Sequence, residues 1–265
     1  MPYASRDGVR LYYELAGSGD PPLVFVHGWC CDRTFFQPQV DHFQTTHTVT
    51  ALDLRGCGTS DCPANGYDIP SLADDVAAVC RTAGIGWPVI VGHSLGGMIA
   101  IELAARYPSL PTAVVAVDPG PINLTPEARC AFEAFATQLA GPDGEAVRRA
   151  WVDSDGMFGT TDDADRRQRI IETMCAVPLT AAAAVIRELV AWNGVGALLL
   201  CGVPILVLLS STGGSNDPAR LFALKPDLTV GVTVGSGHFN QLDVPEQVNA
   251  MITRFLLGPV QASSR

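Results

Sequence analysis

The clearest chemical signal in the chain is a serine flanked by small residues. Gly92-His93-Ser94-Leu95-Gly96 has the form G-x-S-x-G, and it lies between the apolar run 89–91 and a helical segment that begins at Leu95. A sharp strand-to-helix turn of this kind raises the serine hydroxyl above the sheet edge. The helix N-terminus beneath it favours developing negative charge. We therefore predict that Ser94 is a nucleophile.

Two further sites could complete nucleophilic chemistry at Ser94. His238 lies in Gly235-Ser236-Gly237-His238-Phe239, directly after the last predicted core strand, and is the candidate general base. His27-Gly28-Trp29 follows an early strand, and the backbone N–H groups of Trp29 and Leu95 are the candidate oxyanion hole. His27 itself is expected to order its loop. The other histidines are expected on the surface (His42 and His47) or as part of the turn (His93).

The elements that must position these residues alternate between strand and helix. An early antiparallel strand is predicted over 9–15, and short apolar runs typical of buried strands follow it at 23–26, 48–52, 89–91, 114–117, 205–209 and 228–234. Helices are predicted over Ser71–Ala83 with Ser71 as N-cap, over Leu95–Arg106, and over Pro245–Leu257. This alternation predicts an α/β fold, a mostly parallel sheet flanked by helices.

One stretch breaks the alternation. Residues 122–196 have helical character in four pieces: Glu127–Leu139, Glu145–Trp151, Arg166–Met174 and Leu179–Trp192. We interpret them as a helical cap inserted between core strands, above the carboxyl ends of the strands where such sheets bind ligands. The core is then 1–121 and 197–265. The cap offers apolar side chains for a pocket: Phe132, Phe135, Leu139, Trp151, Met157, Phe158 and Trp192.

Composition limits the possible partners. The 265 residues are 48% hydrophobic and 17% charged, with a formal net charge of −10, which disfavours nucleic acid. The N-terminus does not have the pattern of a signal peptide, and no apolar stretch is long enough for a transmembrane helix. The eight cysteines form no C-x-x-C pair, so we expect reduced thiols in the cytoplasm, no metal and no cofactor. A small-molecule substrate is the expected partner, and the oligomeric state stays open.

The chain resembles the α/β-hydrolase superfamily over nearly its whole length. The matching pieces are 27–29, Asp53-Leu54-Arg55-Gly56-Cys57-Gly58-Thr59-Ser60, 92–97, and 237–239 with the following 243–246. The resemblance implies the α/β-hydrolase fold, with Ser94 and His238 in a catalytic triad. It carries little information on the substrate.

The triad acid is where the sequence departs from that family. Most members carry an aspartate in the loop after the strand that ends at Leu209, and the equivalent position here falls near Gly213. Asp217 comes late in that loop, before Pro218, where it could equally be a helix cap. Some members place the acid one strand earlier, and Asp118 at the end of the strand 114–117 would serve. We favour Asp118 and keep Asp217 as the alternative acid.

Three functions remain open on this basis. The first is a serine hydrolase that cleaves an ester or lactone bond of a small, largely apolar substrate through an acyl-enzyme on Ser94. The alternative rests on a further resemblance, carried by Trp29, Asp118 and the residues around His238, to cofactor-free 2,4-dioxygenases of 3-hydroxy-4-quinolones. It would use His238 as the base on a substrate hydroxyl. A non-catalytic ligand receptor on the same fold is the third.

Overall fold

The sheet is the organising element of the molecule. The computed structural model describes residues 2–159, 163–212 and 214–260. Eight strands lie in the order β1-β2-β4-β3-β5-β6-β7-β8, of which the first two pairings are antiparallel and the rest parallel. Their bounds are β1 Tyr3–Arg6, β2 Val9–Ala16, β3 Leu23–Val26, β4 Val49–Leu52, β5 Val89–His93, β6 Ala113–Val117, β7 Ile205–Leu209 and β8 Thr229–Val232. The predicted α/β class with a mostly parallel sheet is confirmed.

The central strands β3 to β7 are buried at every position because both faces of the sheet are covered. In β3, Leu23 and Phe25 face one side, while Val24 and Val26 face the other. Register places Phe25 opposite Ala51 of β4 and Val91 of β5. This two-sided burial explains why continuous apolar runs, rather than alternating ones, predicted these strands.

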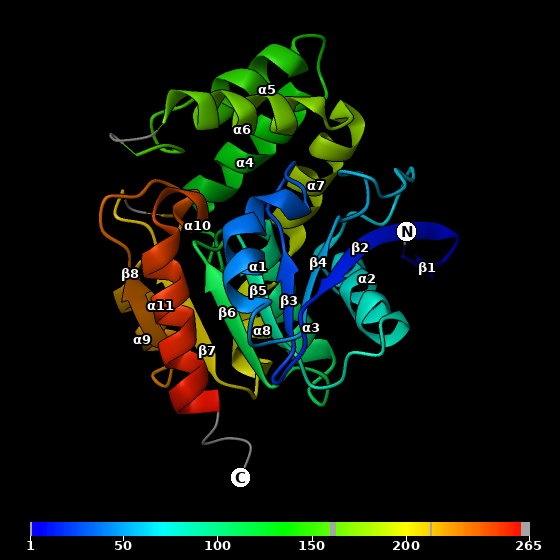
Figure 1. Ribbon diagram of the computed structural model, residues 1–265. Coiled ribbons are helices and arrows are strands. Elements are labelled where there is room, and N and C mark those ends of the chain that lie inside the picture. The colour runs from blue at the N-terminus through cyan, green and yellow to red at the C-terminus, as the bar shows by residue number, and fades with distance from the viewer. Residues whose placement is uncertain (1, 160–162, 213, 261–265) are drawn as a thin grey trace.

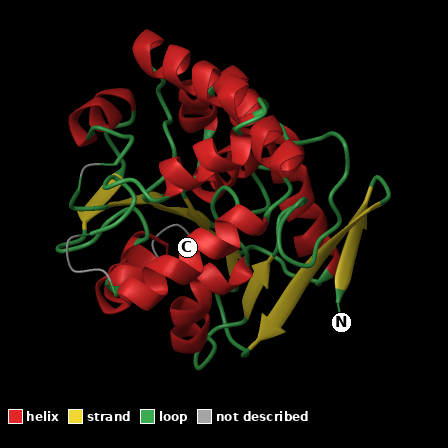
Figure 2. Ribbon diagram, turned by 90° about the horizontal axis from the view of Figure 1, so that it is seen from above, coloured by secondary structure: helices red, strands yellow, loops and turns green. Residues whose placement is uncertain are grey.

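Helices cover both faces (Figures 1 and 2). On one face α1 (Gln37–Phe43) lies beside α11 (Pro245–Phe255). On the other, α3 (Leu95–Arg106) packs between α2 (Ile69–Thr82) and α8 (Gly194–Leu200). The short elements are η1 Arg33–Phe36, α9 Pro218–Leu224, α10 Asn240–Asp243 and η2 Leu256–Val260.

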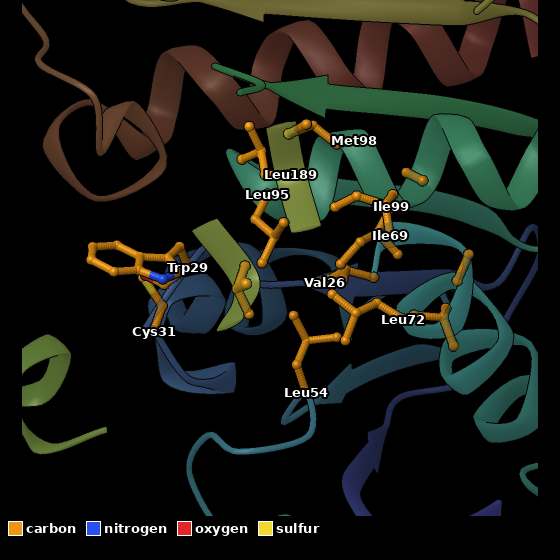
Figure 3. Close-up of a cluster of buried hydrophobic side chains, with 14 of the residues drawn as sticks. Val26, Trp29, Cys31, Leu54, Ile69, Leu72, Leu95, Met98, Ile99 and Leu189 are labelled. Carbon is orange, nitrogen blue, oxygen red and sulfur yellow. The ribbon is translucent and has the colours of Figure 1, made fainter. Parts of the chain in front are cut away.

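Among the described residues, four helices lie beyond the carboxyl ends of the parallel strands, towards the top of Figure 1, and we refer to them as the cap. They are α4 Pro126–Leu139, α5 Gly144–Val152, α6 Ala164–Ala176 and α7 Leu179–Ala191. Leu189 of α7 lies beside Leu95 and Met98 of α3, so cap and core share one hydrophobic cluster (Figure 3). Helix α8 runs across the predicted boundary at residue 196 and packs on α3. The division into core and cap stays a prediction.

Two local findings refine the predicted elements. Helix α2 begins at Ile69 with Asp68 as its N-cap, so the prediction of Ser71 as cap was wrong. The Asp68 carboxylate accepts from the Ser71 N–H (2.8 Å) and hydroxyl (2.7 Å), and Pro70 occupies the first turn, where its missing N–H costs nothing. All eight cysteines are free thiols.

Among the described residues, no single helix has the length and apolarity to cross a membrane, and one bent pair, α6 with α7, passes on length and composition alone.

Candidate active site

Ser94 sits in a strained turn between β5 and α3. Its backbone has φ 52° and ψ −114°, a conformation that side-chain-bearing residues rarely adopt. The turn closes only because its neighbours lack side chains: a Cβ at Gly92 would overlap the Gly96 carbonyl, and one at Gly96 would overlap the Val26 carbonyl. The surrounding fold thus forces the geometry that the motif predicted.

Strand β6 holds this turn from the side. The Ser94 N–H donates to the Val117 carbonyl (3.0 Å), and the Ser94 carbonyl accepts from the Gly120 N–H (3.1 Å). Asp118 and Pro119 are the two residues that lie between Val117 and Gly120 along the chain. The Ser94 turn and the end of β6 are therefore fixed relative to each other.

Asp118 and His238 are in direct contact across 120 residues of sequence. Asp118 Oδ2 lies 2.6 Å from His238 Nδ1, and Oδ1 accepts from the Ser210 N–H at 3.0 Å. Asp118 is only 1% exposed. Because a carboxylate can only accept, Nδ1 carries the proton and Nε2 is left to act as a base.

Asp217 lies elsewhere. Its side chain caps α9, accepting from the Ala219 N–H at 2.9 Å, and is 55% exposed. Gly213, the position where most family members carry the acid, lies outside the described residues. Of the two candidate acids, the structure brings Asp118 and not Asp217 to His238.

The two candidate oxyanion donors come from different segments of the chain and lie at the same cavity. Trp29 follows β3 and Leu95 begins α3, and both line the cavity that contains Ser94. Within the described residues, neither backbone N–H has a hydrogen-bond acceptor. Trp29 is anchored through its indole N–H, which donates to the Ala182 carbonyl of cap helix α7 at 3.0 Å.

The remaining histidines have structural positions. His27 is buried, and its Nε2 accepts from the Leu54 N–H at 2.9 Å, so it orders the loops after β3 and β4 as expected. His93 is also buried, and its Nε2 lies 2.9 Å from the His238 carbonyl. Burial lowers the pKa of His27, and burial together with the nearby His238 lowers that of His93 well below its ordinary value. His42 is exposed and His47 partly so.

The cavity between core and cap has a volume of about 330 Å³ and is mostly apolar. Of the predicted lining residues, Phe132, Trp151 and Met157 face it. The others pack elsewhere: Phe135 against Trp29 and Trp151, Leu139 in the buried core, Phe158 against Phe239, and Trp192 with its indole N–H on Glu102. Asp118 and His238 are the titratable groups among its described lining residues, which include no arginine or lysine. The described residues hold no cluster of metal-binding side chains.

Sequence reasoning missed the contacts that hold the histidine in place. The N–H of His238 donates to the carbonyl of Met157, a cap residue, at 3.1 Å. The Ser210 N–H on Asp118 was also not foreseen. Both use backbone atoms, which leave no residue-type signal in a sequence.

Comparison with known proteins agrees with this fold. The family model described as alpha/beta hydrolase fold matches residues 21–245. The 2-(acetamidomethylene)succinate hydrolase of Mesorhizobium japonicum is 40% identical over 126 residues, which are 48% of this chain and 45% of that protein. The chain thus matches less than half of the length of this relative.

Solved structures match over the whole chain. A putative aryl esterase from Burkholderia cenocepacia has a TM-score of 0.84 at 26% identity, covering 100% of this chain and 99% of that one. Est816, described as an N-acyl homoserine lactone degrading enzyme, has a TM-score of 0.78 at 28% identity, covering 96% of this chain and 100% of that one.

Proposed function

This chain belongs to the alpha/beta hydrolase fold family, and on that premise we propose that it is a serine hydrolase that cleaves an ester or lactone bond of a small, largely apolar substrate. The observation that carries the proposal is the 2.6 Å contact of a buried Asp118 with His238 at the cavity that Ser94 lines. A carboxylate, an imidazole and a serine hydroxyl at one cavity are the parts that acyl transfer requires.

The proposed reaction has two halves. His238 Nε2 takes the proton of Ser94 as Oγ attacks the substrate carbonyl, and the N–H groups of Trp29 and Leu95 stabilise the oxyanion. The imidazolium, stabilised by Asp118, gives its proton to the departing alcohol and leaves an acyl-enzyme. Water then attacks the acyl-enzyme with His238 again as base, which releases the acid and restores Ser94.

The cavity supports a small, neutral substrate. At about 330 Å³ it is at the lower end of ligand sites, which span roughly 300–1,000 Å³. With no cationic side chain among the described lining residues, a substrate carboxylate would lose its hydration without gaining a partner of opposite charge. The names of the structural relatives, an aryl esterase and an acyl-lactone degrading enzyme, are in keeping with such a substrate.

A fluorophosphonate probe followed by peptide mapping tests the nucleophile directly. We expect one labelled peptide containing Ser94, and hydrolysis of short-chain p-nitrophenyl esters that Ser94→Ala abolishes. Ser109→Ala is the control, because Ser109 is exposed and is not among the described lining residues, so both readouts should stay unchanged. Labelling at another serine, or full activity of Ser94→Ala, would contradict the proposal.

The second candidate is the cofactor-free dioxygenase, and the position of the acid after β6 favours it. An Asp118–His238 pair can remove the proton of a hydroxyquinolone without any use of Ser94. Oxygen consumption with release of carbon monoxide from an alkyl-hydroxyquinolone, undiminished in Ser94→Ala, would favour this candidate over the hydrolase.

A further inference from the structure

The loop that carries His238 is held by the cap from two sides. On one side the Met157 carbonyl, between α5 and α6, accepts from the His238 N–H at 3.1 Å. On the other, Arg166 of α6 forms an ion pair with Asp243, with Nη2 and Oδ1 3.1 Å apart. Arg166 Nη1 also donates to the Leu242 carbonyl at 3.2 Å. The cap therefore contacts this loop both at the histidine and behind it.

Asp243 connects the cap arginine to the histidine. Its Oδ2 accepts from the N–H of Gly237, the residue before His238, at 2.9 Å. The Asp243 side chain is 4% exposed, and a carboxylate buried to this extent needs a compensating charge, which Arg166 provides. A continuous polar connection thus runs from Arg166 through Asp243 to the backbone beside His238.

The backbone of the cap leaves this loop little room to shift. A Cβ at Gly237 would lie 2.5 Å from the Gly159 nitrogen and 2.6 Å from the Phe158 carbonyl carbon. The Phe158 ring packs on Phe239, with centroids 5.7 Å apart. Cap and histidine loop are therefore in direct contact at the point where Arg166 and Asp243 pair.

We propose that Arg166 is a positioning residue for His238, an inference that rests on the proposed function. Through Asp243 it holds Gly237 so that the His238 ring meets Asp118 at the cavity that Ser94 also lines. Catalytic groups must be held within roughly 0.5 Å of their productive geometry. Without Arg166, Asp243 loses this ion pair, and its contact with the Gly237 N–H loosens.

The kinetic test compares variants of two arginines on the same helix. Arg166→Met keeps the aliphatic stem and removes the charge. We expect it to lower kcat for p-nitrophenyl butyrate, and the rate of fluorophosphonate inactivation, by about tenfold or more, with KM changed less than about twofold. Arg166→Lys should recover most of the loss. Arg169→Met, an exposed position on α6, should match the wild type.

The variant Asp243→Asn distinguishes the charge of Asp243, which pairs with Arg166, from its hydrogen bond with the Gly237 N–H. An asparagine can still accept from the Gly237 N–H, so it should retain more activity than Asp243→Ala. The effects of Arg166→Met and Asp243→Asn should also be less than additive, because both act on one connection. Wild-type kcat in Arg166→Met, or a loss equal to that of Arg169→Met, would overturn the inference.

A readout independent of turnover keeps the inference distinct from the proposed function. The His238 Nδ1 proton in the short bond to Asp118 should give a low-field proton NMR signal, assigned by its loss in His238→Gln. We expect this signal to shift or broaden in Arg166→Met and to stay unchanged in Arg169→Met. An unaltered signal in Arg166→Met overturns the inference, whereas a wild type that no fluorophosphonate labels overturns only the serine hydrolase.

Discussion

At the residue scale, Asp118 has the most constrained position in the site. One carboxylate oxygen faces His238, and the other accepts from the Ser210 N–H after β7, so the carboxylate plane is fixed from two strands. Its backbone has φ 37°, and a Cβ at Gly214 would lie 2.5 Å from Oδ1. A side chain held in this way costs little to reorganise when the imidazolium forms.

Exchanging each candidate acid for its amide tests this position. Asp118→Asn should lower kcat by about 10³–10⁴, because an amide beside Nδ1 favours the tautomer with the proton on Nε2, where the base must be free. Asp217→Asn should change kcat by less than about twofold, since asparagine also caps helices. Steady-state kinetics on one ester substrate measures both. A larger loss in Asp217→Asn than in Asp118→Asn would contradict the assignment.

The functional side chains of the candidate site could be predicted from the sequence more completely than the hydrogen bonds that hold them in position. Ser94 and His238 follow from a glycine-rich turn and from their place after core strands, and Asp118 from the end of β6. The His93 ring on the His238 carbonyl joins residues 145 positions apart. No spacing rule links such positions, so these supports emerge only from the three-dimensional fold.

At the element scale, the central strands are predictable because burial on both faces of the sheet requires a continuous run of mostly apolar residues. Helix ends were less so: both Asp68 and Ser71 are good caps, and the choice depends on Pro70 fitting the first turn. The edge strand β1 is not predicted, since it has only four residues and carries little apolar periodicity. The cap helices were predicted nearly to their bounds, but not their contacts with the histidine loop.

A buried ion pair ties the loop after β4 to helix α2. Arg55 Nε and Nη2 lie 2.6 Å and 2.7 Å from the two carboxylate oxygens of Asp75, which is fully buried, and Arg6 of β1 also donates to Asp75 at 3.0 Å. Arg55→Met should lower the free energy of unfolding by about 3 kcal/mol, because a buried carboxylate then keeps only one partner.

Urea unfolding of three variants checks this. Arg55→Met combined with Asp75→Leu should be more stable than Arg55→Met alone, since the unpaired charge is removed with its partner. Arg81→Met, an exposed position on α2, should stay within about 0.5 kcal/mol of the wild type. An Arg55→Met variant as stable as Arg81→Met would show that the pair contributes nothing.

At the scale of the whole molecule, two buried histidines link stability to pH. The pKa values of His27 and His93 are lowered by burial, so the folded chain holds both rings neutral where the unfolded chain, with a pKa of about 6.5, takes up protons. Their contribution is fully present above pH 6.5 and decreases as the pH falls below it. The slope from each ring approaches about 1.4 kcal/mol per pH unit where the ring is protonated in the unfolded chain and neutral in the folded one.

Denaturant unfolding at pH 7.5, 6.5 and 5.5 measures this slope. The free energy of unfolding should fall on acidification below pH 6.5, and His93→Gln should show a shallower fall than the wild type. His42→Gln, at an exposed position, should keep the wild-type slope. A His93→Gln variant with an unchanged slope would show that His93 is protonated in the folded state.

The bond between the Met157 carbonyl and the His238 N–H has a consequence for protein engineering. Exchange of the whole cap between related enzymes is a natural engineering strategy, because a different cap would change the substrate range while the core is kept. In this chain a transplanted cap would also replace one of the supports of His238, the proposed general base. A chimera or loop library should therefore retain residues 157–159 and Arg166, and diversify the outer turns of α4 and α5 instead.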